Sequence, residues 1–140
     1  MTNTMLLEPF IGYVPYLALL LRVVVGGTLM IHGYPKLKSS EQSVNWMKSM
    51  GIPGATALLV SILEFFGGLF LVVGLIVPVV ALLFAIQFIS IITMKKSKIK
   101  GAYVTSNQPS YEVDVLYLLL AIILIVLGAG ALSIDGLIGL

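Results

Sequence analysis

The stretch LALLLRVVVGGTLMI, residues 17–31, decides what kind of protein this sequence folds into. Apart from Arg22 and Thr28, every residue in it is apolar or glycine. A helix needs about 20 predominantly apolar residues to cross the hydrocarbon core of a bilayer. The stretch and the residues before it therefore predict a membrane-spanning helix over 13–31. An arginine at the centre of such a helix is costly in lipid, so we expect Arg22 to have a partner or a function there.

A second stretch, LLVSILEFFGGLFLV at residues 58–72, has the same character and carries Glu64 near its centre. Consecutive spans cross the membrane in opposite directions, and both charges lie near the middle of their span. We therefore expect Arg22 and Glu64 to meet near the midplane as a buried ion pair. Such a pair could take part in a reaction. It could also serve only to hold two helices in register, because removing one partner of a buried pair is costly in either case.

The composition excludes a water-soluble globule. Of the 140 residues, 59% are hydrophobic and 10% are charged, and the mean hydropathy is +1.12, whereas soluble domains carry about 25% charged residues. Backbone polar groups find no water in lipid, so the spans must be helical. We predict an all-α membrane protein with a single transmembrane domain over residues 1–140. Its expected architecture is a four-transmembrane-helix bundle with spans at about 13–31, 54–75, 77–94 and 113–131.

The two long polar connections predict how the bundle lies in the membrane. The first, residues 32–53, places Val44, Met47 and Met50 on one side of a short helix beside Trp46, which is typical of an interfacial helix. All seven lysines lie in the two long connections (Lys36, Lys38, Lys48, Lys95, Lys96, Lys98 and Lys100). The positive-inside rule then predicts that both long loops are cytoplasmic and that both termini lie outside the cell membrane.

Helical spacing brings a set of polar residues onto the inward faces of the spans. Arg22 shares one half of its helix with His32, and Asp114 begins a stripe of acidic and small residues on the last span. These residues predict a polar column that runs from the cytoplasmic interface to the bilayer centre. We assign catalytic roles to Arg22, Glu64 and Asp114, and substrate-binding roles to His32, Lys36 and Gln87.

Two of these assignments have a simpler alternative, and the sequence also limits the chemistry. His32 could simply form a hydrogen bond at the interface. Asp114 could simply stabilise its helix by lying at the positive N-terminal end of the helix dipole.

The chain has no cysteine and one histidine. Iron–sulfur clusters, bis-histidine haem ligation and zinc or copper sites need more ligands of these types. We therefore expect no haem, iron–sulfur cluster or metal on this chain alone.

Three segments carry motifs in a recognisable order. An arginine, paired glycines and an H-G-x-x-K-L end occur in LLLRVVVGGTLMIHGYPKL (19–37), and a glutamate before paired glycines occurs in GIPGATALLVSILEFFGGLFLVVGL (51–75). An acidic start and a G-x-G-x-x-S-x-D end occur in YEVDVLYLLLAIILIVLGAGALSID (111–135). In this order the chain resembles the DoxX family of small four-helix membrane proteins. The family positions that carry over are Arg22, Gly26, His32, Gly33, Lys36, Glu64, Gly67, Gly68, Asp114, Ser133 and Asp135.

The resemblance implies a link to quinone-dependent oxidation, either of the thiosulfate:quinone oxidoreductase type or in a terminal quinol oxidase, with quinone as the cofactor. In that function Arg22 or His32 would bond a ring carbonyl, Glu64 or Asp114 would relay protons, and a partner subunit would supply electrons. A small proton-coupled transporter is a second hypothesis, and a structural or assembly subunit is a third. In each case we expect membrane lipid and other membrane subunits or further copies of the chain as partners, and not nucleic acid.

Overall fold

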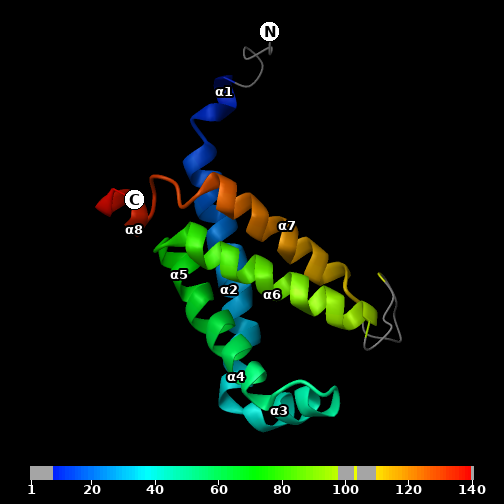
Figure 1. Ribbon diagram of the computed structural model, residues 1–140. Helices are drawn as coiled ribbons and strands as arrows, with labels where there is room; N and C mark the ends of the chain where they lie inside the picture. The colour runs from blue at the N-terminus through cyan, green and yellow to red at the C-terminus, as the bar shows by residue number, and fades with distance from the viewer. Residues whose placement is uncertain (1–7, 98–102, 104–109, 140) are drawn as a thin grey trace.

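The computed structural model describes residues 8–97, 103 and 110–139, and this part of the chain is built from helices joined by short connections (Figure 1). Lys98 and Lys100 of the basic run lie outside the described residues. The helices are α1 (Glu8–Ile11), α2 (Val14–Lys38), α3 (Ser40–Ser49), α4 (Gly54–Ile62), the π-helical turn η2 (Leu63–Gly67), α5 (Gly68–Val73), α6 (Val77–Ser97), α7 (Glu112–Leu127) and α8 (Ile134–Ile138).

The first helix pair consists of α2 and the continuous run of α4, η2 and α5, which packs against it in the opposite direction. Glycines let the two backbones meet. A Cβ atom on Gly26 would lie 2.5 Å from the carbonyl oxygen of Gly68, and a Cβ atom on Gly33 would lie 2.8 Å from the backbone nitrogen of Phe65. Small residues at helix contacts are how membrane helices approach closely. The glycines therefore determine the register of this pair.

The second helix pair consists of α6 and α7, which lie side by side (Figure 1). It joins the first pair through the turn after α5, where Gly74 takes the left-handed conformation with φ of +78°. From that junction α6 runs away from α4, so the two pairs diverge toward the end of α6 that carries Lys95 (Figure 1). A cavity lined by residues of both pairs lies at that end of the molecule.

The apolar core lies where the two pairs meet, and the outward faces of the helices are apolar as well. Phe84 and Leu124 are buried at the centre of this core together with Leu29, Leu71, Val77, Ala81 and Phe88. Large apolar side chains such as Leu20, Ile86 and Val126 point outward and are well exposed. Contiguous exposed apolar surface on this scale is unusual for a soluble monomer and is expected where lipid is the solvent.

Within the described residues, three helical segments are long and apolar enough to cross a membrane: Val14–Lys38, Gly54–Val73 and Val77–Ser97. The first continues beyond the predicted end at residue 31, because its last turns pack on η2 through Gly33. The predicted span 113–131 corresponds to α7, which has 16 residues and ends at Leu127 because Gly128 and Gly130 take positive φ values of 71° and 80°. The short helix predicted in the first long connection is present as α3.

Candidate functional site

Arg22 lies at the junction of the two helix pairs, fully buried with 0% of its surface exposed. Its guanidinium donates hydrogen bonds to three backbone carbonyls: Nη1 to Leu71 at 3.1 Å and Val72 at 3.4 Å, and Nη2 to Leu132 at 2.5 Å. The absence of a side chain on Gly74 makes room for it, since a Cβ atom there would collide with Nη1. Arg22 thus ties the end of α5 to the segment between α7 and α8.

Asp135 completes this junction from α8. Its carboxylate accepts hydrogen bonds from the backbone nitrogens of Ile76 at 2.7 Å and Val77 at 2.9 Å. These N–H groups lie at the start of α6, where a helix offers them no acceptor of its own. Its own backbone nitrogen donates to the carbonyl of Gly74 at 2.9 Å. Ser133 caps α8 by accepting from the Gly136 nitrogen at 2.9 Å. The G-x-G-x-x-S-x-D end of the sequence therefore folds into a clasp that closes the junction.

The predicted ion pair between Arg22 and Glu64 is wrong. Gly26 faces Gly68 in an antiparallel pair, so Arg22 lies level with Val72, while Glu64 lies level with Gly33 at the other side of the crossing point. At about 1.5 Å per residue, the two levels are about 16 Å apart along α2. The similar positions of the two charges within their spans did not place them at the same depth, because the spans are staggered.

Glu64 lies in η2 with 4% of its surface exposed, and its partners come from α2 and α6. The ammonium of Lys36 donates to both of its carboxylate oxygens, at 2.9 Å and 3.2 Å. The Nε2 atom of Gln87, on α6, donates to the same carboxylate at 3.0 Å. The side-chain oxygen of Gln87, Oε1, is buried and has no hydrogen-bond partner among the described residues. A π-helical turn inside an α-helix is frequent at functional sites, and here it carries the carboxylate.

Asp114 forms a second ion pair on the opposite helix pair. The ammonium of Lys95, near the end of α6, lies 2.6 Å from Asp114 Oδ2 and also donates to the carbonyl of Ser110 at 3.0 Å. These contacts hold the start of α7 against the end of α6. Both charged side chains are mostly buried, and the charge of the Asp114 carboxylate is balanced by Lys95, as that of Glu64 is by Lys36.

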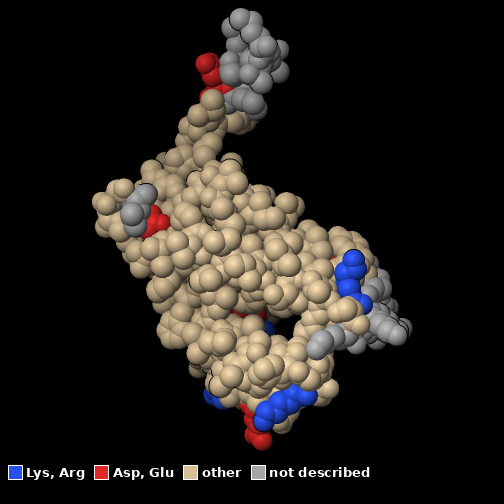
Figure 2. Space-filling view, viewed as in Figure 1, with Lys and Arg blue, Asp and Glu red and all other residues tan. Residues whose placement is uncertain are grey.

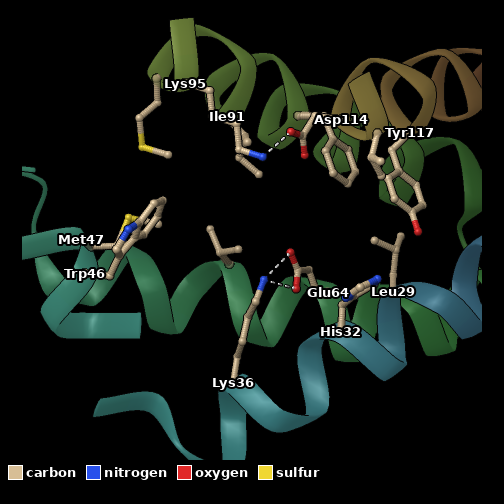
Figure 3. A pocket seen from close by; sticks show the side chains of 14 residues that line it. Leu29, His32, Lys36, Trp46, Met47, Glu64, Ile91, Lys95, Asp114 and Tyr117 are labelled. Atoms are coloured by element: carbon tan, nitrogen blue, oxygen red, sulfur yellow. Dashed lines mark hydrogen bonds and ion pairs between the residues drawn. The ribbon is translucent and has the colours of Figure 1, made fainter. Parts of the chain in front are cut away.

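The two ion pairs face each other across one cavity of about 260 Å³ (Figure 3). In Figure 2 the hollow appears between the region of α3 and the end of α6, with acidic and basic atoms visible at its edge. Its lining residues are Leu29, His32, Lys36, Trp46, Met47, Val60, Glu64, Phe88, Ile91, Met94, Lys95, Val113, Asp114 and Tyr117. The rings of Phe88 and Tyr117 stack with centroids 5.1 Å apart and planes 10° from parallel. The cavity therefore combines charged, aromatic and apolar surface.

The structure brings five of the six predicted site residues to this region. His32, Lys36, Glu64 and Asp114 line the cavity, and Gln87 bonds Glu64 beside it. Arg22 is the exception, because it lies in the junction described above. The structure thus divides the predicted polar column into two separate polar centres.

Sequence reasoning missed Lys95 and Tyr117. Lys95 counted only as part of a basic run that sets orientation, although it follows Gln87 and Ile91 at four-residue steps and therefore shares their helix face. Tyr117 follows Asp114 by three residues, which places both on one side of α7. Helical spacing could have found both residues, but it could not have shown that the two faces converge.

Fold and site together define a helical, multi-pass membrane protein with a charged cavity between two divergent helix pairs. The chain belongs to the DoxX family, whose model matches residues 17–96. It is also 33% identical over 118 residues to the protein named "Putative oxidoreductase CatD" of Bacillus subtilis (strain 168), a match that covers 84% of this chain and 83% of that relative. No solved structure was found to match it.

Proposed function

We propose that this protein is the integral membrane subunit of a quinone-linked oxidoreductase and that its cavity receives the quinone ring. The observation that carries the proposal is the pair of neutralised carboxylates, Glu64 and Asp114, on facing walls of a cavity that also contains stacked aromatic rings. The family and the name of the Bacillus subtilis relative are consistent with redox chemistry. At about 260 Å³ the cavity is slightly smaller than the usual range for small-molecule pockets, about 300–1,000 Å³, and so suits a small ring.

The proposal includes a full four-span bundle. In it α7 is the fourth span, tilted little because its 16 residues are few for a bilayer. Helix α3 lies at the membrane interface, with the half-exposed Trp46 at the level of the lipid headgroups. The lysines of both long loops lie on the cytoplasmic side, and the termini lie outside. This arrangement opens the cavity toward the cytoplasmic leaflet.

The donors and acceptors of the cavity suit a quinone ring. A ring oxygen accepts hydrogen bonds, and the lining side chains with an N–H or O–H group to donate are His32, Lys36, Trp46, Lys95 and Tyr117. Each lysine already holds a carboxylate. In the proposed route Glu64 or Asp114 first takes up a proton from the cytoplasmic side and then passes it to an oxygen of the reduced ring, and the lysine again balances the charge of the carboxylate that is left. The flat stack of Phe88 and Tyr117 offers a face for a planar ring.

Quinone supplies two-electron redox chemistry, and this chain supplies the binding site and the proton route. Electrons would enter from a partner membrane subunit, or from a redox protein docked on the membrane, and two protons would accompany two electrons onto each quinone. In this proposal Arg22 is not a reacting residue. Its bonds to the carbonyls of Leu71, Val72 and Leu132 hold the junction that keeps the two helix pairs at their angle.

Binding can be tested through Trp46, which is the only tryptophan of the chain and lines the cavity. The protein in lipid vesicles is titrated with menaquinone-4 and with ubiquinone-2, and the quenching of Trp46 fluorescence is followed. We expect saturable quenching by at least one of them. Glu64→Gln should weaken it by about tenfold, which is about 1.4 kcal/mol, because the substitution removes the ion pair at the cavity wall.

Glu41→Gln is the matched control, since Glu41 is exposed on α3 and does not line the cavity. It should leave the binding curve unchanged. If quenching by both quinones rises linearly without saturation, the cavity does not bind them and the proposed function is wrong. Equal weakening by the two substitutions would also count against it, because only one of the two carboxylates belongs to the site.

A further inference from the structure

A second hollow, of about 280 Å³, adjoins the cavity between α4 and α6. We call it the α4–α6 groove, and its lining residues are Met47, Ile52, Thr56, Val60, Gln87, Ser90, Ile91 and Met94. Four of them, Met47, Val60, Ile91 and Met94, also line the cavity. The groove therefore lies directly beside the cavity, with these four side chains between them.

The groove and the cavity differ in chemistry. All four charged residues, Lys36, Glu64, Lys95 and Asp114, line the cavity, and none of them lines the groove. Gln87 stands between the two, because it lines the groove while its Nε2 atom donates to Glu64. A ligand that fills both spaces would thus need a polar head at one end and a hydrocarbon chain at the other.

The outer edge of the groove leads to the lipid-facing surface. Leu59, the neighbour of Val60 on α4, is 67% exposed. Ile86 and Ile89, which directly precede the groove residues Gln87 and Ser90 on α6, are more than half exposed. Apolar side chains exposed on both helices next to the groove mean that a hydrocarbon chain leaving it would meet lipid and not water. None of the residues that line the groove is charged, so a hydrocarbon chain in it would not have to pack against a charged side chain.

We propose that the α4–α6 groove holds the hydrocarbon tail of the ligand whose ring occupies the cavity, so that the ligand is an isoprenoid quinone or quinol and not a tail-less aromatic compound. This inference rests on the proposed function and adds the substrate class. The groove gives the tail a fixed exit between α4 and α6. It also restricts the orientation of the ring, because the tail-bearing edge must face Gln87.

The test compares two probes with one ring: menadione, which has no tail, and menaquinone-4, which has the same ring with an isoprenoid tail. Thr56→Phe fills the groove from α4 without touching the cavity, since Thr56 lines only the groove. Leu58→Phe, at an exposed position of the same helix that lines neither the groove nor the cavity, is the matched control and should leave both Kd values unchanged. Phenylalanine adds no tryptophan, so Trp46 stays the only tryptophan of the chain. Ser90→Phe fills the groove from α6 and replaces Thr56→Phe if that variant does not fold.

We expect Thr56→Phe to raise the Kd of menaquinone-4 by at least about tenfold and to change the Kd of menadione by less than about twofold. Unchanged binding of menadione shows that the variant is folded and that its cavity is intact. Equal effects on both probes, or no effect on either, would overturn the groove as a tail site. If only ubiquinone-2 binds the unmodified protein, the same comparison is made between it and ubiquinone-0, which has the same ring without a tail. If none of these quinones binds, the proposed function itself fails and takes the groove assignment with it.

Discussion

The separation of Arg22 from Glu64 leads to a quantitative prediction about their energetic coupling. Lys36 Nζ lies 2.9 Å from a Glu64 oxygen, whereas Arg22 lies about 16 Å from the level of Glu64 along α2. Coulomb energy falls as the inverse of distance, so the contact pair should couple about five times as strongly as the distant pair. Lys36 is 40% exposed, which weakens its pair through solvent screening.

Two double-mutant cycles measure these couplings. The variants are Glu64→Gln, Lys36→Met and Arg22→Gln, singly and in the two pairs that contain Glu64→Gln. For residues in contact, coupling energies range from about 0.5 to 3 kcal/mol. With the exposure of Lys36 taken into account, we expect about 1–2 kcal/mol for Lys36 with Glu64 and below about 0.4 kcal/mol for Arg22 with Glu64.

The assay is unfolding of the protein in mixed micelles by increasing sodium dodecyl sulfate, followed by the fluorescence of Trp46. The free energy of unfolding is compared among variants at a common detergent fraction. Arg22→Gln alone should still destabilise the protein by about 1–3 kcal/mol, because buried carbonyls lose a charged donor. The reasoning is refuted if Arg22 couples to Glu64 as strongly as Lys36 does, since that result would require the two charges to be in contact.

Two further substitutions test the packing that separates the two polar centres. Gly26→Ala should destabilise the protein by about 1–3 kcal/mol in the same unfolding assay, because its Cβ atom would lie 2.5 Å from the Gly68 carbonyl oxygen. Gly27→Ala is the control, since its Cβ atom would meet nothing within 4 Å, and it should not destabilise the protein. Asp135→Ala should cost about 2 kcal/mol or more, because the Ile76 and Val77 nitrogens lose their acceptor. Asp135→Asn should fall between it and the unmodified protein, and equal stability of all three would contradict the capping role.

The helices and the polar residues could be predicted from the sequence because both depend on local information. The apolar stretches around Arg22 and Glu64 exclude water, and a chain without water must satisfy its backbone by forming helices. His32, Lys36 and Asp114 stood out because charged and polar groups beside such stretches need partners. All three line the cavity.

The boundaries were less predictable where tertiary contacts extend or end a helix. The helix of Arg22 continues to Lys38 because Gly33 packs on η2, and it is this extension that brings Lys36 to Glu64. Similarly, α7 ends at Leu127 so that the following residues can turn back to the junction. Hydropathy alone reports neither event, because it ends the first helix at the polar residues 32–38 and continues the last helix through the apolar residues after Leu127.

What the local sequence could not specify is the stagger between helices, and the stagger decides which charges meet. Arg22 and Glu64 each precede a facing glycine, Gly26 or Gly68, by four residues. In an antiparallel pair whose glycines face each other, two such charges lie on opposite sides of the crossing point and cannot touch. Composition and periodicity therefore identify a membrane protein with buried charges, whereas close contact between two glycine-lined backbones selects Lys36 as the partner of Glu64 and leaves Arg22 to the junction.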